Sequence, residues 1–195
     1  MSAYSTQNDL LMTNLLAFYN RDENLRTMLR VVAGETRVSL RIVDWFVTNY
    51  AKKYYTVYNI SADPATGALS RRFKVYTDYK LKLKAYSKKR FDPFCRWDRI
   101  SIPYTTHSSV QTTIGQLNFF KWIIESDIIQ YIEDHYDEIE ADMNNRNSTS
   151  KKRDKPDVGG GTVSGTKTRK KREELSISAT KTIKTENVEI VVSFS

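Results

Sequence analysis

Apolar residues recur every three or four positions along the first fifty residues, the spacing that is typical of amphipathic helices. Leu11, Leu15 and Phe18 share one face of a first predicted helix. A second helix is predicted to end at Gly34, because glycine tolerates the left-handed conformation in which many helices stop. A third is predicted to begin after Ser39, a good N-cap residue, because apolar residues follow at the i, i+3, i+4 and i+7 spacing.

The centre of the chain predicts an antiparallel hairpin with a long loop. Residues 54–60 and 71–86 flank a segment that carries Asp-Pro and Gly turn signals. From Phe73 to Lys84 apolar and basic residues alternate over a long stretch, which favours a strand with one apolar face. A helix is the alternative interpretation, since apolar residues of the same run also fit helical spacing: Tyr76, Tyr79, Leu83 and Tyr86.

Pro93 interrupts the chain after this run, and residues 99–104 predict a further short strand. Thr113 is a suitable N-cap for a long helical stretch that follows it, with a break at Ser126 and Asp127. The predicted fold class is therefore α+β: helices at the amino terminus, a central antiparallel hairpin with an extra strand, and a long helical stretch that closes the core.

Three zones are expected along the chain. Residues 1–143 form a globular domain, residues 144–172 have the polar, glycine-containing and basic composition of a linker, and residues 173–195 form a carboxyl-terminal arm. The arm is expected to end in a β-strand that joins a partner, because apolar residues occupy alternate positions there: Val188, Ile190, Val192 and Phe194. A neighbouring molecule is the preferred partner, and the protein's own sheet is the alternative.

The net charge of +8 is concentrated in the predicted linker. Residues 146–172 contain ten basic and two acidic residues, whereas the rest of the chain is neutral. Such a segment is suited to bind phosphate backbones, an anionic membrane or an import receptor, and a plain solubilising linker is an equal alternative. The candidate polyanion-binding or partner-binding residues are Lys151, Lys152, Arg153, Lys155, Lys167, Arg169, Lys170, Lys171 and Arg172.

No catalytic, metal-binding or cofactor-binding pattern is found, and the chain is predicted not to be an enzyme. Cys95, His107 and His135 are too few and too widely spaced for a closed zinc site. The glycine run 159–165 matches neither a phosphate loop nor a dinucleotide fingerprint. A single cysteine, the lack of a signal peptide and the lack of a long apolar run predict a protein of the cell interior without a membrane span.

Two further groups of residues combine charge with aromatic rings. The first has the composition of a surface on which single-stranded nucleic acid stacks, although the solvent face of a strand is the preferred interpretation; it comprises Lys80, Lys82, Lys84, Lys88, Lys89 and Arg90 with Tyr79, Tyr86 and Phe91. The second is predicted to be a structural motif that fixes a turn, since large aromatic side chains are costly to expose, and an exposed recognition loop is the alternative; it comprises Phe91, Asp92, Pro93, Phe94, Cys95, Arg96 and Trp97.

Three segments carry a resemblance to a known family: VSLRIVDWFVTNYAKK (38–53), FKVYTDYKLKLKAYSKKRFDPFCRWDRI (73–100) and TTIGQLNFFKWIIESDIIQYI (112–132). They resemble a conserved family of small proteins from nucleocytoplasmic large DNA viruses of the phycodnavirus and mimivirus type. The resemblance covers about residues 36–135 and supplies no active-site residues. It implies a virus-encoded protein that resides in the virion, or otherwise in the host cytoplasm or nucleus.

The expected function is structural. By analogy with small viral proteins that combine a compact domain with an extended arm, we expect a minor capsid, cement or assembly protein that contacts other capsid proteins and tethers neighbours through its arm. The alternative is a DNA-binding or RNA-binding accessory factor of viral transcription or packaging. Neither function needs a cofactor or a small-molecule substrate.

Overall fold

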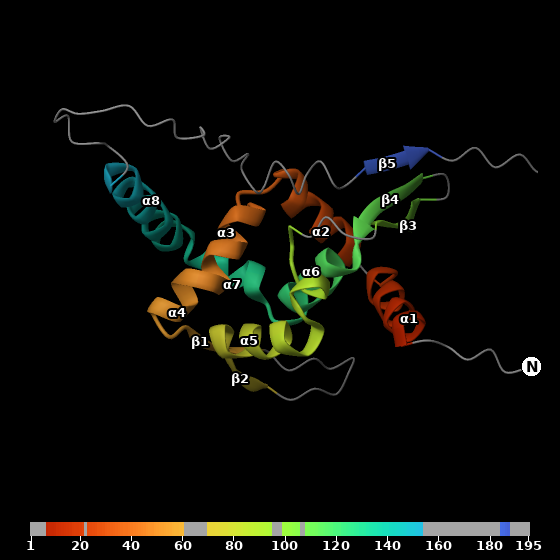
Figure 1. The fold of residues 1–195 in the computed structure, drawn as a ribbon, viewed down its shortest axis with the longest axis horizontal. Helices are drawn as coiled ribbons and strands as arrows, with labels where there is room; N and C mark the ends of the chain where they lie inside the picture. Colours follow the sequence, from red (N-terminus) through yellow and green to blue (C-terminus); the bar gives the residue numbers. More distant parts are fainter. Residues whose placement is uncertain are drawn as a thin grey trace, which may run out of the picture.

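A computed structural model describes residues 7–21, 23–60, 70–94, 99–105, 108–153 and 184–187. Helices and short antiparallel strands alternate along the chain (Figure 1), which confirms the α+β class. The elements are α1 (Gln7–Tyr19), α2 (Asn24–Ala33), α3 (Leu40–Trp45), the π-helical turn η1 (Phe46–Tyr50), α4 (Ala51–Lys53), β1 (Val57–Ile60), β2 (Arg71–Lys74), α5 (Val75–Tyr86), the 3₁₀ turn η2 (Lys88–Arg90), β3 (Arg99–Thr105), β4 (Ser108–Thr113), α6 (Ile114–Glu125), α7 (Ile128–Asp134), α8 (Tyr136–Arg153) and β5 (Lys184–Asn187).

Local signals in the sequence place several helix ends correctly. Gly34 ends α2 in the left-handed region, with φ of 74°. The Ser39 hydroxyl accepts a hydrogen bond from the Ile42 amide at the start of α3, and the Thr113 hydroxyl accepts one from the Gln116 amide at the start of α6. Both side chains satisfy amide groups that the first turn of a helix leaves unpaired.

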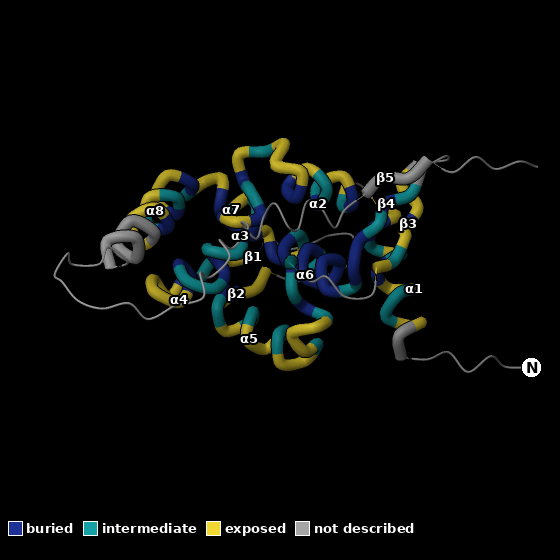
Figure 2. Tube along the Cα trace, turned by 45° about the horizontal axis from the view of Figure 1, so that its top comes forward, coloured by how far each residue is buried: buried dark blue, intermediate teal, exposed yellow. Residues whose placement is uncertain are grey.

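Helix α6 lies at the centre of the molecule and is buried for most of its length (Figure 2). Its aromatic residues Phe119 and Trp122 pack around Phe91, with ring centroids 5.6 Å from that ring in both cases. Burial of several large aromatic side chains supplies much of the apolar area of a domain of this size. The core therefore forms around α6, with α1, α2, α5 and α7 placed against it.

Polar side chains of α6 hold the segment that joins α5 to β3. The buried Gln116 donates a hydrogen bond from Nε2 to the Pro93 carbonyl at 3.0 Å, and Asn118 donates from Nδ2 to the Arg90 carbonyl at 2.9 Å. Because a buried amide without a partner would be costly, these bonds fix the path of this segment relative to the core.

The strands form two small antiparallel sheets. β1 pairs with β2 as the predicted hairpin, with Tyr58 opposite Phe73. The second sheet has the order β3-β4-β5, with β4 in the middle. β3 is the extra strand that the sequence predicts, whereas β5 joins from near the carboxyl terminus.

The prediction of a long strand from the alternation after Phe73 is wrong. The strand β2 stops at Lys74, and residues Val75–Tyr86 form helix α5. The helix allows Tyr79 to pack on Phe91 and Trp122, and Asp78 to accept a hydrogen bond from the Trp122 indole at 2.6 Å. The helical spacing, considered as the alternative, agrees with these contacts.

Helix α8 extends to Arg153, beyond the predicted end of the globular domain at residue 143. Its first half is joined to the α3–η1–α4 helix by Asp142, which accepts hydrogen bonds from the Trp45 indole at 3.1 Å, the Tyr54 hydroxyl at 3.2 Å and the Lys53 ammonium. Among the helices that the structure describes, none combines the length and apolar character needed to cross a bilayer.

Candidate nucleic-acid interface

Basic residues dominate the stretch of chain that contains α4, β2, α5 and η2. The described residues 51–60 and 70–94 contain eleven basic and two acidic residues. Both acidic side chains accept internal hydrogen bonds, Asp78 from Trp122 and Asp92 from the Phe94 amide at 2.8 Å. We call this part of the molecule the basic surface; its charged residues are Lys52, Lys53, Arg71, Arg72, Lys74, Lys80, Lys82, Lys84, Lys88, Lys89 and Arg90.

Two adjoining hollows lie in the basic surface. The first has a volume of about 510 Å³ and the second about 590 Å³, and Tyr76 and Thr77 of α5 line both. Together they form what we call the α5 groove. The first hollow is lined by Ala51, Lys52, Tyr55, Thr56, Val57, Lys74, Tyr76 and Thr77. The second is lined by Tyr76, Thr77, Lys80, Leu81, Leu83 and Lys84.

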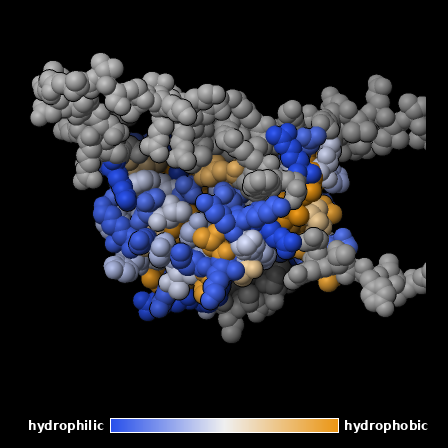
Figure 3. Space-filling model, in the orientation of Figure 1, coloured by the Kyte–Doolittle hydropathy of each residue, from blue (hydrophilic) through white to orange (hydrophobic). Residues whose placement is uncertain are grey.

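The groove combines cationic side chains with aromatic and aliphatic ones. In Figure 3 the lower margin of the described part, where Figure 1 places β2 and α5, is mainly hydrophilic with isolated hydrophobic residues. Tyr55 and Leu81 are among the most exposed large hydrophobic residues of the described chain, at 85% and 60%. The Lys52 ammonium lies 5.7 Å from the centre of the Tyr76 ring. Lysines beside exposed apolar rings suit a ligand that carries both negative charge and flat apolar surface.

Tyr55 is positioned by the end of the α3–η1–α4 helix. The Thr56 amide donates to the Ala51 carbonyl at 3.2 Å, which closes the helix end around Tyr55. Tyr55 occupies the left-handed region with φ of 51°, at a position where glycine is usual. Ala51 and Thr56 are buried on either side of it, so the backbone is fixed while the Tyr55 ring projects into solvent.

Comparison with known proteins assigns the chain to a family. The model of DUF7197, a family of unknown function, matches residues 3–193. The chain belongs to this family. It is also 42% identical over 144 residues to the uncharacterized protein L507 of Acanthamoeba polyphaga mimivirus. The predicted relationship to a giant-virus protein family is thereby confirmed.

The alignment covers 71% of the DUF7197 chain and 53% of the mimivirus protein, so the chain spans about half the length of that relative. No solved structure matches the chain.

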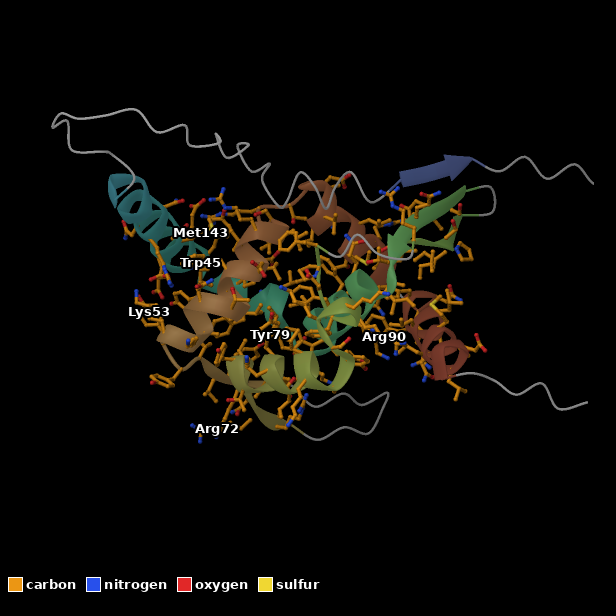
Figure 4. The ribbon with its side chains drawn as sticks, in the orientation of Figure 1. Trp45, Lys53, Arg72, Tyr79, Arg90 and Met143 are labelled. Carbon is orange, nitrogen blue, oxygen red and sulfur yellow. The ribbon has the colours of Figure 1, made fainter. Side chains whose placement is uncertain are left out.

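Only part of the predicted stacking surface of the DUF7197 chain is available to a ligand. Lys80 and Lys84 line the second hollow. Tyr79 and Tyr86 instead face Phe91, with ring centroids 6.1 and 5.8 Å away, and Phe91 is buried. Figure 4 shows Tyr79 extending from α5 toward the interior, while Arg72 points outward from β2. Sequence analysis missed Tyr55, Tyr76 and Leu81 as groove residues.

The predicted structural motif is partly described. Phe91 and Pro93 are buried, Asp92 accepts from the Phe94 amide, and Phe94 is half-buried against the core. Cys95, Arg96 and Trp97 lie outside the described residues.

The predicted tail sites fall largely outside the described part of the chain. Lys151, Lys152 and Arg153 belong to the last turn of α8, and the remaining basic candidates, Lys155 to Arg172, lie outside the described residues. The predicted partner strand, Val188 to Phe194, also lies outside them. The strand that the structure does describe nearby, β5, pairs with the protein's own β4, with Thr185 opposite Val110.

The carboxyl group of Asp44 on α3 has a perturbed pKa. Burial, together with the charge of Asp92, raises the pKa of Asp44 to about 6. Burial and then the charges of Asp44 and Asp92 raise the pKa of Tyr79 to about 12. Within the described ranges, no three His, Cys, Asp or Glu residues gather in a way that would hold a metal ion.

Proposed function

We propose that this DUF7197 chain is a nucleic-acid-binding protein of a large DNA virus and that it holds the polyanion along the α5 groove. The observation that carries this function is the excess of eleven basic over two acidic residues on a surface that also contains both hollows. Lysines that neutralise phosphates release condensed counterions, and this release drives binding without regard to base sequence. The function involves no catalytic step and needs no cofactor.

Regular elements hold the cationic side chains of the groove in place. Lys74 ends β2, and Lys80 and Lys84 follow on exposed positions of α5 one helical turn apart. Lys52 comes from α4 on the other side of the first hollow. Because these elements are packed on the core, the charges are arranged before a ligand arrives, which lowers the entropic cost of binding.

An acidic part of the molecule complements this arrangement. Residues 123–145, which include α7 and most of the described part of α8, contain eight acidic residues and no Lys or Arg. Asp137 and Asp142 pair with Arg37 and Lys53, and other acidic residues remain exposed. Figures 1 and 2 both show α8 and α5 on different sides of the molecule. The negative side repels nucleic acid, so the ligand is directed to the basic surface.

Charge reversal in the groove tests this function. We expect the full-length double variant Lys74→Glu/Lys80→Glu to bind a fluorescent oligonucleotide at least tenfold more weakly than the unchanged protein at about 0.1 M salt, because it replaces two attractive contacts by repulsive ones. The matched control is Arg21→Glu/Arg30→Glu, which makes the same change in net charge on exposed residues outside the groove. An equal loss in both variants, or no loss in either, contradicts binding in the groove.

A role in virion assembly is the second candidate. It is favoured by β5, which adds to β4 through main-chain pairing of four residues, Lys184–Asn187, close to the carboxyl terminus. Strand addition of this kind also joins separate protein molecules. In this role the chain is a minor capsid or cement protein that contacts other capsid proteins in the virion. Recovery from purified particles in a fixed ratio to the capsid protein supports it, and absence from such particles contradicts it.

A further inference from the structure

Tyr55 combines a strained backbone with an exposed side chain. Its φ of 51° is one that residues with a Cβ rarely adopt, and its side chain gains little packing in return because the residue is 85% exposed. Glycine at this helix end would avoid the strain. Strain that the fold maintains without a structural benefit is typical of functional positions.

The surroundings of Tyr55 fit one class of ligand. Tyr55 lines the first hollow together with Tyr76, so two aromatic rings are available beside the same space. Ala51 and Val57 add apolar lining, and Lys52 and Lys74 add positive charge. A volume of about 510 Å³ lies in the range of pockets that hold small planar ligands. A nucleobase with its flanking phosphates offers both the flat surface and the negative charge that these side chains match.

We propose that the α5 groove selects single-stranded over double-stranded nucleic acid, and that Tyr55 stacks on an unpaired base in the first hollow while Lys52 and Lys74 contact the flanking phosphates. This selectivity rests on the nucleic-acid binding proposed above. In a duplex both faces of each base are already stacked on neighbouring bases, so a ring beside the helix reaches only the backbone and the groove edges. A single strand leaves the base faces free.

The second hollow continues the same arrangement along α5. Leu81 is 60% exposed there, and Lys80 and Lys84 line the hollow with it. Since Tyr76 and Thr77 line both hollows, a strand that leaves the first meets the second directly. Repeated apolar contacts flanked by lysines suit a chain of nucleotides better than a single small anion.

The decisive comparison is between a single strand and a duplex of equal length, each measured with the full-length protein. We expect Tyr55→Ala to weaken binding of a labelled thymidine 15-mer by about tenfold or more, as loss of one base–aromatic contact does, and to change binding of the duplex less than twofold. Tyr55→Phe keeps the ring and should bind the single strand as the unchanged protein does. Tyr104→Ala, which removes a 40% exposed tyrosine of β3, is the matched control.

An abasic oligonucleotide of the same length and charge isolates the stacking contact. For the unchanged protein, replacing the normal oligonucleotide by the abasic one should weaken binding about as much as Tyr55→Ala weakens binding of the normal oligonucleotide. For Tyr55→Ala, the same replacement should weaken binding little further, because the stacking contact is already lost. Equal losses on single strand and duplex, or none on the single strand, overturn the role of Tyr55. If Lys74→Glu/Lys80→Glu still weakens binding in that case, nucleic-acid binding in the groove stands without the selectivity. Binding of phosphatidylserine vesicles through Tyr55, with no binding of the oligonucleotide, overturns both.

Discussion

Asp44 and Tyr55 are both held in environments that cost folding free energy. Asp44 lies on α3, and its pKa is raised by burial and by Asp92. Burial and then the charges of the same two carboxyl groups raise the pKa of Tyr79 on α5. Deprotonation of Asp44 therefore places a second negative charge beside Asp92 in a poorly hydrated site, so the folded state holds the Asp44 proton more tightly than the unfolded state does.

Stability should consequently fall as pH rises. The pKa of Asp44 rises from its ordinary value of 3.8 to about 6 on folding. The protonated carboxyl therefore contributes its full stabilisation below about pH 4, and this is lost as pH passes through 6. At pH 7.5 the cost is about 2–3 kcal/mol. We expect Asp44→Asn to unfold at higher urea concentration than the unchanged protein at pH 7.5 and to show a smaller stability difference between pH 5 and pH 7.5. A variant that is less stable at both values would show that the carboxylate is needed for packing.

The strain at Tyr55 gives a second prediction. We expect Tyr55→Gly to stabilise the protein by about 1 kcal/mol, because glycine adopts the left-handed region without the clash of a Cβ, even though it also gains entropy in the unfolded state. Tyr55→Ala keeps the Cβ and should leave the free energy of unfolding nearly unchanged. Urea denaturation of the two variants measures the difference, and a Tyr55→Gly protein that is less stable than Tyr55→Ala would mean that the backbone at this position is unstrained.

At the scale of elements, the sequence predicts the helix ends that are set by residues next to them in the chain. Gly34, Ser39 and Thr113 act through their own backbone or hydroxyl groups, and the structure uses each as predicted. The predicted break at Ser126 and Asp127 is also present between α6 and α7, where Asp127 has φ of 52°. Such local chemistry needs no knowledge of the tertiary fold.

Helix α5 shows where prediction from local sequence fails. The run after Phe73 fits both a period of two and a period of 3.6, so the pattern alone does not choose. Contacts with distant residues decide it, because only the helix brings Asp78 to the Trp122 indole and Tyr79 to Phe91. The groove could not be predicted either. It depends on the helical face of α5 and on the end of α4, which together bring Tyr55 and Tyr76 to one hollow.

Asp142 is one of several side chains that attach α8 to the α3–η1–α4 helix. Although burial opposes it, hydrogen bonds from Lys53 and Trp45 hold the pKa of Asp142 below its usual value. We expect Asp142→Ala to destabilise the protein by about 1–3 kcal/mol, since it leaves the Trp45 indole and the Tyr54 hydroxyl without this acceptor. The contribution of Asp142 is present above the ordinary pKa of aspartate and fades as pH falls below it, so the penalty should shrink in acid.

Glu133→Ala is the matched control, because it removes an exposed carboxylate of the neighbouring helix α7. It should change the free energy of unfolding by less than about 0.5 kcal/mol in thermal or urea denaturation. If Asp142→Ala is equally mild, α8 is held by its apolar contacts and the polar cluster contributes little.

At the scale of the whole molecule, the distribution of charge is more informative than its sum. The sequence places the excess of +8 in residues 146–172 and leaves the remainder neutral. That neutral remainder carries the basic surface on α4, β2, α5 and η2 and acidic residues on α7 and α8, and the two regions meet where Lys53 pairs with Asp142. A polyanion therefore meets two candidate basic regions, the groove and the tail, and the groove is built on packed elements.

The salt dependence of binding distinguishes these two regions. For a single strand, the slope of log K against log salt concentration is about −0.7 for each phosphate neutralised. Lys52→Ala/Lys74→Ala in the full-length protein should therefore make the slope shallower by about 1.4, because two contacts are lost while the tail is unchanged. Deletion of residues 154–172 should also make the slope shallower if the tail touches the strand. The Tyr55-dependent preference for a single strand should persist. Anisotropy titrations between 50 and 300 mM salt give both quantities. If the lysine variant keeps its full slope and the deletion alone removes binding, the polyanion is held by the tail, and the α5 groove serves another ligand.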